Sequence, residues 1–419
     1  MTNIVFNVHS AYLKNALEKL SKVINKNSLI PELRQVKFRI HSFDLLVISG
    51  TNLKFYGIEE LPTETIKHEV SPDTLVELLF NPVVISKALK REGIIQFRID
   101  SHKLKAEMVL PGNVSISLWV NEPDDFPENV SGIELEAEKH TLVPIPYQTK
   151  EQKKTALKAL SFGYHCSHLL DNSLQGFRGA YFIPDEEGKN VSVFSVDGNR
   201  LAFTPLDTLS PGKLDLKGFA AIDMDGVKVI EHYMKKDTSS QLSLEFSYFG
   251  SKKVLTLRGQ NSKVSILSSQ AEMMDFEEYL PSDAIAGQET GFHIKTDELL
   301  NLFKEFSGIS SDFRSGFVRE SENNKLELVF AAAEPSESTV TIPLVSNSND
   351  TDLSNFSLSL GNGPGKRKNF YLNQNYMMDA LKTFSSEYIN IGSEGEGYPI
   401  YLYGSETAEK CVIMGLSLR

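Results

Sequence analysis

The sequence predicts an α+β protein of three repeated domains, each with two helices packed on antiparallel sheets. A pattern of one strand, one helix and two strands occurs three times, and a second pattern of a helix and a strand hairpin alternates with it. A repeat of this size dictates the architecture before any single residue is interpreted. The length of 419 residues also fits three domains of ordinary size.

The first pattern starts with a short strand and an amphipathic helix. In its first copy, Phe6 and Val8 mark the strand, and apolar residues recur at helical spacing from Leu13 to Ile24. Two short strands follow within residues 36–49. Equivalent patterns occupy residues 156–194 and 292–330.

The second pattern is a helix that runs almost directly into a hairpin. Its copies occupy residues 82–110, 227–257 and 373–403. Their strands alternate apolar and polar positions and are rich in β-branched and aromatic residues, as half-buried antiparallel strands are. Together the two patterns predict domains at 1–130, 131–286 and 287–419.

Composition limits the classes of function. The net charge of −12 and the pI near 5.4 argue against a protein that coats nucleic acid with its whole surface, but they leave room for positive charge on one face. No run approaches the ~20 apolar residues that span a bilayer, and the first residues lack the pattern of a signal peptide. We therefore expect a cytoplasmic protein with no membrane partner.

The cysteines and the remaining motifs indicate neither a cofactor nor a metal site. Cys166 and Cys411 both lie in apolar surroundings, which favours structural thiols over a disulfide, and no Cys/His spacing suggests zinc. The glycine-rich stretch 361–367 lacks the spacing and the Ser/Thr of a phosphate loop. Acidic pairs such as Asp124 and Asp125 lie in apparent turns, and no nucleophile signature is present. The sequence does not indicate an enzyme.

Positive charge concentrates on two equivalent helices. In the first helix, Lys19, Lys22 and Lys26 would share a stripe opposite the apolar face. The equivalent helix of the second domain opens with four lysines: Lys150, Lys153, Lys154 and Lys158. The alternative is that these lysines form ordinary solvated faces. A further group, Lys87, Lys90 and Arg91, ends a helix, where cations also suit the helix dipole.

Six stretches, in the same order, resemble the bacterial DNA polymerase III β subunit, the sliding clamp family. The most diagnostic is Ser195–Ala202, which resembles the family's A-T-D-G-H-R-L-A string. The others are Asn27–Leu33, Ile48–Leu53, Asp125–Glu128, Met274–Pro281 and Val412–Leu418. The resemblance spans the whole chain.

The sequence departs from the family pattern at several positions. Asn199 replaces a common His, Met274 replaces a Pro, and 415–417 read Gly-Leu-Ser in place of Pro-Met-Arg. Extra length is present near 68–82 and in 345–369, which suggests a divergent member.

The resemblance implies a ring-shaped, head-to-tail homodimer of DNA-clamp domains that encircles double-stranded DNA without reading its sequence. It implies no catalytic site, and as partners the polymerase III α subunit, the clamp loader and other proteins that carry a clamp-binding motif. The residues expected to contact DNA are Lys19, Lys22, Lys26, Asn27, Lys150, Lys153, Lys154 and Lys158.

The resemblance also implies a pocket for short peptides between the second and third domains. Its expected residues are Phe177, Val196, Gly198, Asn199, Arg200, Leu201, Met274, Glu278, Tyr279, Val412, Met414, Gly415 and Leu416. Without the resemblance, Arg200 and Leu201 would only finish a strand, and the last residues would form an edge strand. Two alternatives to a clamp stay open: an interaction scaffold of clamp-like fold that does not form a ring, and an enzyme that acts on nucleic acid.

Overall fold

The computed structural model forms two compact units, which are described separately. Unit 1 contains Met1–Lys153, Glu186–Lys189 and Thr208–Gln270, and unit 2 contains Lys154–Asp185, Asn190–Asp207 and Ala271–Arg419. The structure describes residues 3–41, 44–68, 76–100, 102–128, 130, 139–167, 179–184, 190–196, 199–207, 219–249, 251–271, 276, 280, 292–306, 316–320, 326–330, 340–344, 370–393, 399–404 and 409–414.

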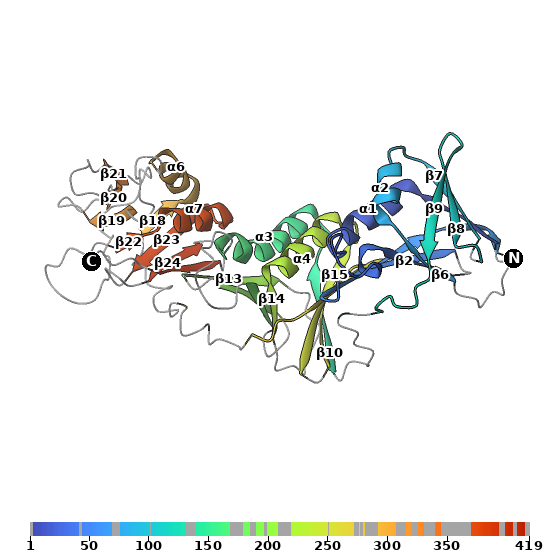
Figure 1. The fold of residues 1–419 in the computed structure, drawn as a ribbon. Coiled ribbons are helices and arrows are strands. Elements are labelled where there is room, and N and C mark those ends of the chain that lie inside the picture. Colours follow the sequence, from blue (N-terminus) through green and yellow to red (C-terminus); the bar gives the residue numbers. More distant parts are fainter. Residues whose placement is uncertain are drawn as a thin grey trace. The chain divides into compact units, whose positions relative to one another are not determined.

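Unit 1 begins with the strand and helix that the sequence predicts (Figure 1). Its first part contains β1 (Asn3–His9), α1 (Ser10–Leu20), a 3-10 turn (Glu32–Arg34), β2 (Val36–His41), β3 (Leu45–Thr51), β4 (Phe55–Pro62), β5 (Glu64–His68), β6 (Val76–Phe80), α2 (Pro82–Ala88), β7 (Ile94–Asp100), β8 (Lys105–Leu110) and β9 (Val114–Asn121). The rest contains β10 (Lys139–Pro146), β14 (Ala220–Asp223), α4 (Met224–Lys236), β15 (Gln241–Phe249), β16 (Lys252–Arg258) and β17 (Ser262–Leu267). Helix α3 (Lys150–Ser167) starts at the end of unit 1.

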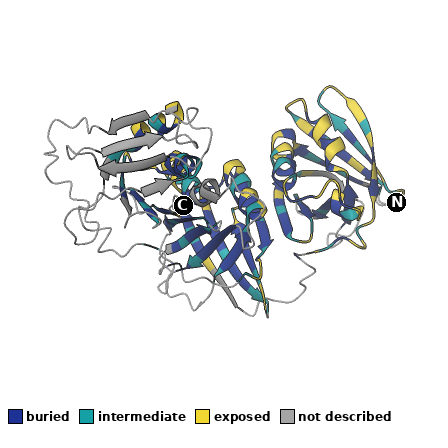
Figure 2. Ribbon diagram, turned by 60° about the vertical axis from the view of Figure 1, so that its left-hand side comes forward, coloured by how far each residue is buried: buried dark blue, intermediate teal, exposed yellow. Residues whose placement is uncertain are grey.

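One continuous sheet runs through unit 1. Its strand order is β10-β15-β16-β17-β4-β3-β2-β6-β9-β8-β7-β1-β5, and neighbouring strands are antiparallel. One face of its first-domain strands packs with the apolar sides of α1 and α2 around Phe6, Phe38 and Phe97. Figure 2 shows buried positions in dark blue along the strands and exposed positions in yellow on the helices. The amphipathic periodicity therefore places the polar faces of the helices in solvent.

Unit 2 contains the remaining strands and helices. They are β11 (Gly179–Pro184), β12 (Asn190–Val196), β13 (Arg200–Asp207), β18 (Phe292–Lys295), α6 (Thr296–Phe306), β19 (Gly316–Glu320), β20 (Leu326–Phe330), β21 (Val340–Leu344), β22 (Phe370–Leu372), α7 (Gln374–Thr383), β23 (Tyr388–Ser393), β24 (Ile400–Gly404) and β25 (Lys410–Ile413). One sheet runs in the order β11-β12-β13-β25-β24-β23-β18, and another runs β21-β20-β19-β22. Helices α6 and α7 pack on the first of these sheets through Leu299, Phe303 and Met377.

Local sequence sets the helix starts. The side chains of Asn81, Asp223 and Asn373 cap α2, α4 and α7 by accepting a hydrogen bond from a backbone N–H of the first turn. At α3, Thr149 Oγ1 accepts from Gln152 N at 3.1 Å, while Gln152 Oε1 accepts from Thr149 N at 3.0 Å. This reciprocal pair is a capping box.

The predicted repeat of helices and strands is confirmed, and one backbone contact recurs at the start of the first helix of a domain. Ser10 N donates to Gly93 O, and Thr296 N donates to Glu387 O, both at 2.9 Å. The two predicted patterns did not include the third strand that the structure shows, which is β4, β13 and β21 in the first pattern and β9, β17 and β25 in the second. Only the strand end at Arg200 and Leu201 and an edge strand of the last residues were expected in this part of the fold. These third strands make the contacts between consecutive predicted domains. The domain limits themselves stay a prediction.

The extra length predicted near 68–82 contributes β5 and β6, with residues 69–75 outside the described part. The segment 345–369, which includes the glycine-rich stretch 361–367, lies outside the described residues. In the part of the chain that is described, no helix is both long enough and apolar enough to cross a membrane.

Candidate functional sites

The first site lies where the first and second predicted domains meet, at the first junction, which we define as the antiparallel pair β4–β17. Ser265 lies opposite Tyr56 and Ile266 opposite Phe55, and Leu267 N donates to Lys54 O at 2.9 Å. Helix α1 packs against both α2 and α4 beside this junction (Figure 1). The outward side of the junction is closed by a cluster that includes Tyr56, Phe126 and Leu267.

A buried charge cluster lies under the first junction. Lys19 Nζ is 3.0 Å from Glu59 Oε2 and 3.6 Å from Asp237 Oδ2, and only 4% of Lys19 is exposed. Asp237 also accepts hydrogen bonds from Ser239 N and Ser262 Oγ. Burial alone would raise the pKa of Asp237, but these hydrogen bonds and the charge of Lys19 keep it below its ordinary value. Burial raises the pKa of Glu59 to about 8 against the attraction of Lys19. The cluster thus contains two carboxyl groups and one ammonium group.

This cluster corrects the prediction for the first helix. Helix α1 ends at Leu20, so Lys22, Lys26 and Asn27 follow it in turns and are exposed, whereas Lys19 faces the protein interior. The predicted stripe of three lysines therefore does not exist as one helical face. The prediction was wrong because it assumed that the helix continues to Lys26, almost two turns beyond its end at Leu20.

The second lysine group lies at the start of α3, as expected. Lys150 and Lys154 are exposed, and Lys153 and Lys158 are half-buried. Lys153 Nζ lies 4.8 Å from the centre of the Tyr147 ring, a cation–π contact that leaves its charge in place.

Cations that the sequence reasoning did not select gather in a notch between α1 and α2. A hollow of about 360 Å³ is lined by Lys14, Lys90 and Arg91, with Glu18 and Lys236 paired at 2.6 Å on its border. Burial lowers the pKa of the nearby His232, and the charges of Lys22 and Lys236 lower it further. With Glu92 also in its lining, the hollow still carries more cationic than acidic side chains, in a chain whose net charge is negative.

The second site lies at the second junction, the antiparallel pair β13–β25, within unit 2. Leu201 lies opposite Val412 and Arg200 opposite Ile413, and Met414 N donates to Asn199 O at 2.9 Å. The pairing brings the predicted peptide-site residues of the two strands together, although they are about 200 residues apart in sequence. Leu201 and Val412 are buried, Val196 and Asn199 are half-buried, and Met414 is 47% exposed.

Arg200 has a different role from the one predicted. Its side chain is fully buried, Nη1 lies 3.3 Å from Asp379 Oδ2, and its guanidinium lies 4.3 Å from the centre of the Tyr376 ring. Successive residues of a strand point to opposite faces, so Arg200 points to α7 while Leu201 points away from it. Arg200 therefore supports the site from below. Its side chain is not exposed at the surface of the strand pair.

Helix α7 supplies two residues that the sequence reasoning missed. Tyr376 lies over Arg200 and its hydroxyl accepts from Asn199 Nδ2 at 3.4 Å, and Asp379 pairs with both Arg200 and Lys382. Nothing local in the sequence of α7 marks them, because their partners come from a distant strand. The predicted residues Phe177, Gly198, Met274, Glu278, Tyr279, Gly415 and Leu416 lie outside the described part of the chain.

Phe276, between the second and third predicted domains, covers part of β11 and β12. The ring of Phe276 stacks on Phe194 at 4.5 Å and meets Tyr181 edge-on at 4.8 Å. Phe126 occupies the matching place at the first junction, where Lys37 Nζ lies 5.4 Å from its ring centre. Phe126 and Phe276 thus have corresponding places on the sheets of their domains. Among the described residues, no cluster of three His, Cys, Asp or Glu side chains could hold a metal ion.

No protein-family model matches the sequence, and no curated protein matches it. Solved structures match it over nearly its whole length. The DNA polymerase sliding clamp of Bacillus subtilis is 14% identical, with a TM-score of 0.74 and 100% of both chains covered. The clamp of Caulobacter crescentus is 13% identical, with a TM-score of 0.74, 99% of this chain and 100% of that chain covered. The DNA polymerase III β subunit of Thermotoga maritima is 15% identical, with a TM-score of 0.71 and the same coverage.

Identities of this size show the fold alone. The chain has the α+β fold of bacterial β sliding clamps, which confirms the fold that the sequence resemblance predicted.

Proposed function

We propose that the protein is a DNA sliding clamp: two copies close head to tail into a ring around duplex DNA and tether replication and repair proteins through the second junction. The observation that carries this proposal is the internal repeat of the junctions. The first and second junctions both pair the third strand of one domain with the third strand of the next. The two remaining third strands, β9 and β21, are the strands that a second copy would bring together.

Both strands have an open side among the described residues. Residues 114–118 of β9 pair with β8 only, since β6 reaches β9 only at Val120 and Asn121. Strand β21 pairs with β20 only. Open edges invite pairing with another chain. Because each junction joins one domain to the next, β9 of one copy and β21 of the other give a heterologous contact that closes after two copies.

The two internal junctions also predict the register of this contact, which we call the closing junction. Tyr56 lies opposite Ser265 in the first junction, and Leu201 lies opposite Val412 in the second. The equivalent residues are Val340 on β21 and Ser117 on β9, as the registers of β20–β21 and β8–β9 show. We therefore expect Ser117 of one copy to lie opposite Val340 of the other.

The exposed cations of the helices suit the backbone of DNA. Lys22 and Lys26, the notch cations Lys14, Lys90 and Arg91, and the lysines of α3 would attract phosphates without reading bases. Such contacts are weak and sensitive to salt, as sliding requires. A chain with a net charge of −12 would keep DNA away from its other faces.

The second junction supports the tethering role. Exposed Met414 offers an apolar side chain to Leu or Phe anchors of a peptide, at the end of a strand pair whose Leu201 and Val412 are buried. The Arg200–Asp379 ion pair ties this strand to α7. The polymerase III α subunit, the clamp loader and other proteins with a clamp-binding motif are the proposed partners. The protein would act as an accessory factor without a catalytic site. The alternative is a scaffold of the same fold that does not encircle DNA. Such a scaffold would not be topologically linked to a circular DNA.

A covalent ring tests the proposal without any partner protein. Ser117→Cys and Val340→Cys in one chain should cross-link two copies at both closing junctions in the presence of circular plasmid. The ring should then stay on the plasmid through detergent treatment and be released when the plasmid is linearised. A pair two residues out of register, Ser115→Cys with Val340→Cys, is the matched control, and each single-cysteine variant controls for the chain's own thiols.

Retention on linear and circular DNA to the same extent would contradict the proposal. In the same assay without cross-linking, neutralising Lys14, Lys90 and Arg91 should weaken DNA association and lower its salt dependence. The slope of log K against log salt should fall by about 0.9 for each phosphate that the variant no longer neutralises.

A further inference from the structure

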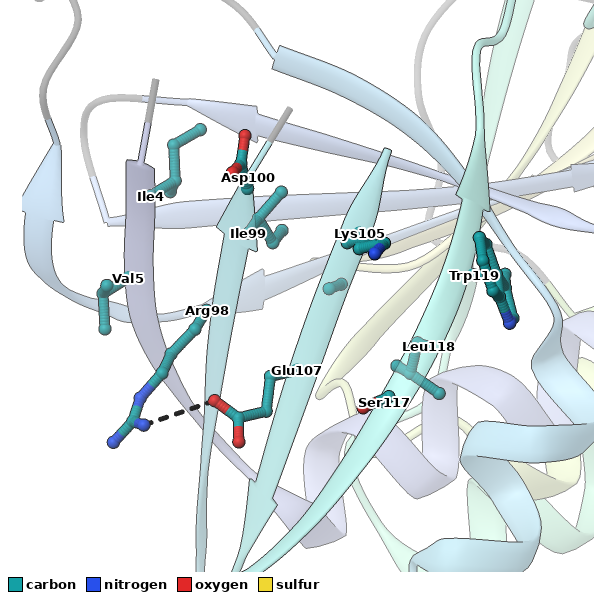
Figure 3. A pocket seen from close by; sticks show the side chains of 11 residues that line it. Ile4, Val5, Arg98, Ile99, Asp100, Lys105, Glu107, Ser117, Leu118 and Trp119 are labelled. Atoms are coloured by element: carbon teal, nitrogen blue, oxygen red, sulfur yellow. Dashed lines mark hydrogen bonds and ion pairs between the residues drawn. The ribbon is translucent and has the colours of Figure 1, made fainter. Parts of the chain in front are cut away.

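A hollow lies on the outward face of the sheet formed by β1, β7, β8 and β9. It has a volume of about 660 Å³ (Figure 3). The ion pair of Arg98 and Glu107, at 3.3 Å, lies toward one side, and Trp119 lies at the other, on β9. Trp119 is the only tryptophan of the chain, and 80% of it is exposed.

Trp119 is unusual for an exposed position. Large aromatic side chains stabilise a fold or an interface most when they are buried. A single exposed apolar residue is ordinary, unless it lies where another chain could bind. Lys105 Nζ lies 5.7 Å from the centre of its ring, but this contact leaves most of the ring in solvent. Trp119 lies on β9 where this strand pairs with β8 alone, so its position is one where another strand could pair.

The internal repeat identifies the residues equivalent to Trp119. Strand registers align Leu118 with Ile266 and Ile413, which are buried residues of β9, β17 and β25. The next residue is Trp119 in β9 and Leu267 or Met414 in the other two. The backbone N–H groups of Leu267 and Met414 both donate at 2.9 Å to the strand of the preceding domain. Trp119 therefore occupies the position that anchors the end of a junction.

The exposure of Ser117 shows that β9 lacks the neighbouring strand that covers the equivalent residue of the first junction. Ser265 in the first junction is 6% exposed because β4 and the residues around Tyr56 cover it, whereas the equivalent Ser117 is exposed. The first junction also receives an aromatic ring from the residues between two domains, Phe126, and the corresponding Phe276 covers β11 and β12 beside the second junction. No linker of that kind joins two separate copies, so an aromatic ring at the closing junction must come from the strands themselves.

We infer that Trp119 is the anchor residue of the closing junction and that its ring is covered by the β21-bearing sheet of a second copy of this chain. The occupant of the outward hollow beside β9 is thus part of a second copy, continuous with the β9–β21 pairing. This inference rests on the proposed ring and deepens it. Tryptophan at a fully desolvated interface position is among the residues that contribute most to binding.

The single tryptophan makes the test direct. Emission of Trp119 is followed while the wild-type protein is diluted through its dimer–monomer transition, with the mass measured by light scattering at each concentration. The emission maximum should shift to shorter wavelength as the dimer forms, because the ring leaves water. Trp119→Ala should raise the dimer dissociation constant about tenfold or more and speed subunit exchange. Trp119→Phe should recover part of the affinity.

Leu29→Ala is the matched control, since Leu29 is also a large exposed apolar residue but belongs to the segment between α1 and β2 and not to β9. It should leave the dissociation constant unchanged. A dimer whose Trp119 emission does not change on dissociation would overturn this inference and leave the ring intact. A monomer at all concentrations would overturn the ring proposal itself. Far-UV circular dichroism and Trp119→Phe distinguish removal of the indole ring from misfolding of the variant.

Discussion

The first and second junctions use the same antiparallel strand pairing, and one of the differences between them is a helix position. Three residues after its capping residue, α4 has Gly226 and α7 has Tyr376. A Cβ at Gly226 would lie 2.4 Å from Ile222 Cγ2 and 3.1 Å from Ile266 Cγ2, so α4 packs directly on β17. At the second junction the Tyr376 ring covers the Arg200 guanidinium, 4.3 Å from the ring centre.

The same repeat unit thus forms a buried structural contact at the first junction and a candidate docking surface at the second. The first junction has apolar packing outside and the Lys19–Glu59–Asp237 cluster inside, and its strand end at Leu267 is covered. The second junction has its ion pair under the strand, and its strand end at Met414 is exposed. Substitutions in the buried cluster and at the two strand ends can test this contrast.

The largest effect is expected from Lys19→Ala. Removing the ammonium group leaves the carboxyl groups of Glu59 and Asp237 buried without their cation, and breaking a buried pair in this way lowers the free energy of unfolding by about 3–5 kcal/mol. Chemical denaturation near pH 8 measures it. Lys22→Ala, three residues on and exposed, is the control and should change the stability by about 0.5 kcal/mol or less. Similar losses of stability for both variants would mean that the cluster does not stabilise the junction.

The next prediction concerns the pH dependence of that cluster. The pKa of Glu59 is about 8 in the folded protein and its ordinary value is 4.5, so between these pH values the folded chain keeps a proton that the unfolded chain has released. Stability should therefore fall as pH rises, by at most about 1.4 kcal/mol per pH unit from this group, and level off above pH 8. The charged and titratable groups that face Glu59 are Lys19 of α1, and Tyr233 and Asp237 of α4 and its end.

Glu59→Gln removes the titrating group while its amide oxygen can still accept a hydrogen bond from Lys19. Denaturation of the wild type and this variant between pH 6 and pH 8 should show a flatter dependence for the variant. The two curves should lie furthest apart at pH 8, with the variant more stable. Parallel curves would show that Glu59 is ionised throughout this range.

Periodicity predicted most of the helices and strands, but not the third strands that form the junctions. β4 contains Gly57, whose absent Cβ makes room for Tyr233 and Leu20, and Pro62 ends the strand. Such residues are rare inside strands, so the local pattern is weak. The reason they are present is tertiary: another domain approaches the backbone closely at this strand.

The candidate sites were predictable only where a residue's role does not depend on a distant partner. Helical spacing could not show that Lys19 meets Glu59 and Asp237, because these residues are 40 and 218 positions away. The resemblance located β13 and the last strand as one site, which the structure brings together, but it did not separate Arg200 beneath the strand from Leu201 above it. That separation follows from strand alternation once the strand start is known.

The smallest effect is expected at the two equivalent strand ends. Met414→Ala removes an exposed apolar side chain from the proposed peptide surface and should weaken a Gln-Leu-x-Leu-Phe type peptide by about fivefold, which corresponds to about 1 kcal/mol. Leu267→Ala makes the same kind of truncation at the first junction, where Tyr56 and Phe126 already close the surface, and should leave peptide affinity unchanged. Titration of a fluorescent peptide measures both. Equal weakening by the two variants would mean that exposure of the strand end does not distinguish the docking junction from the structural one.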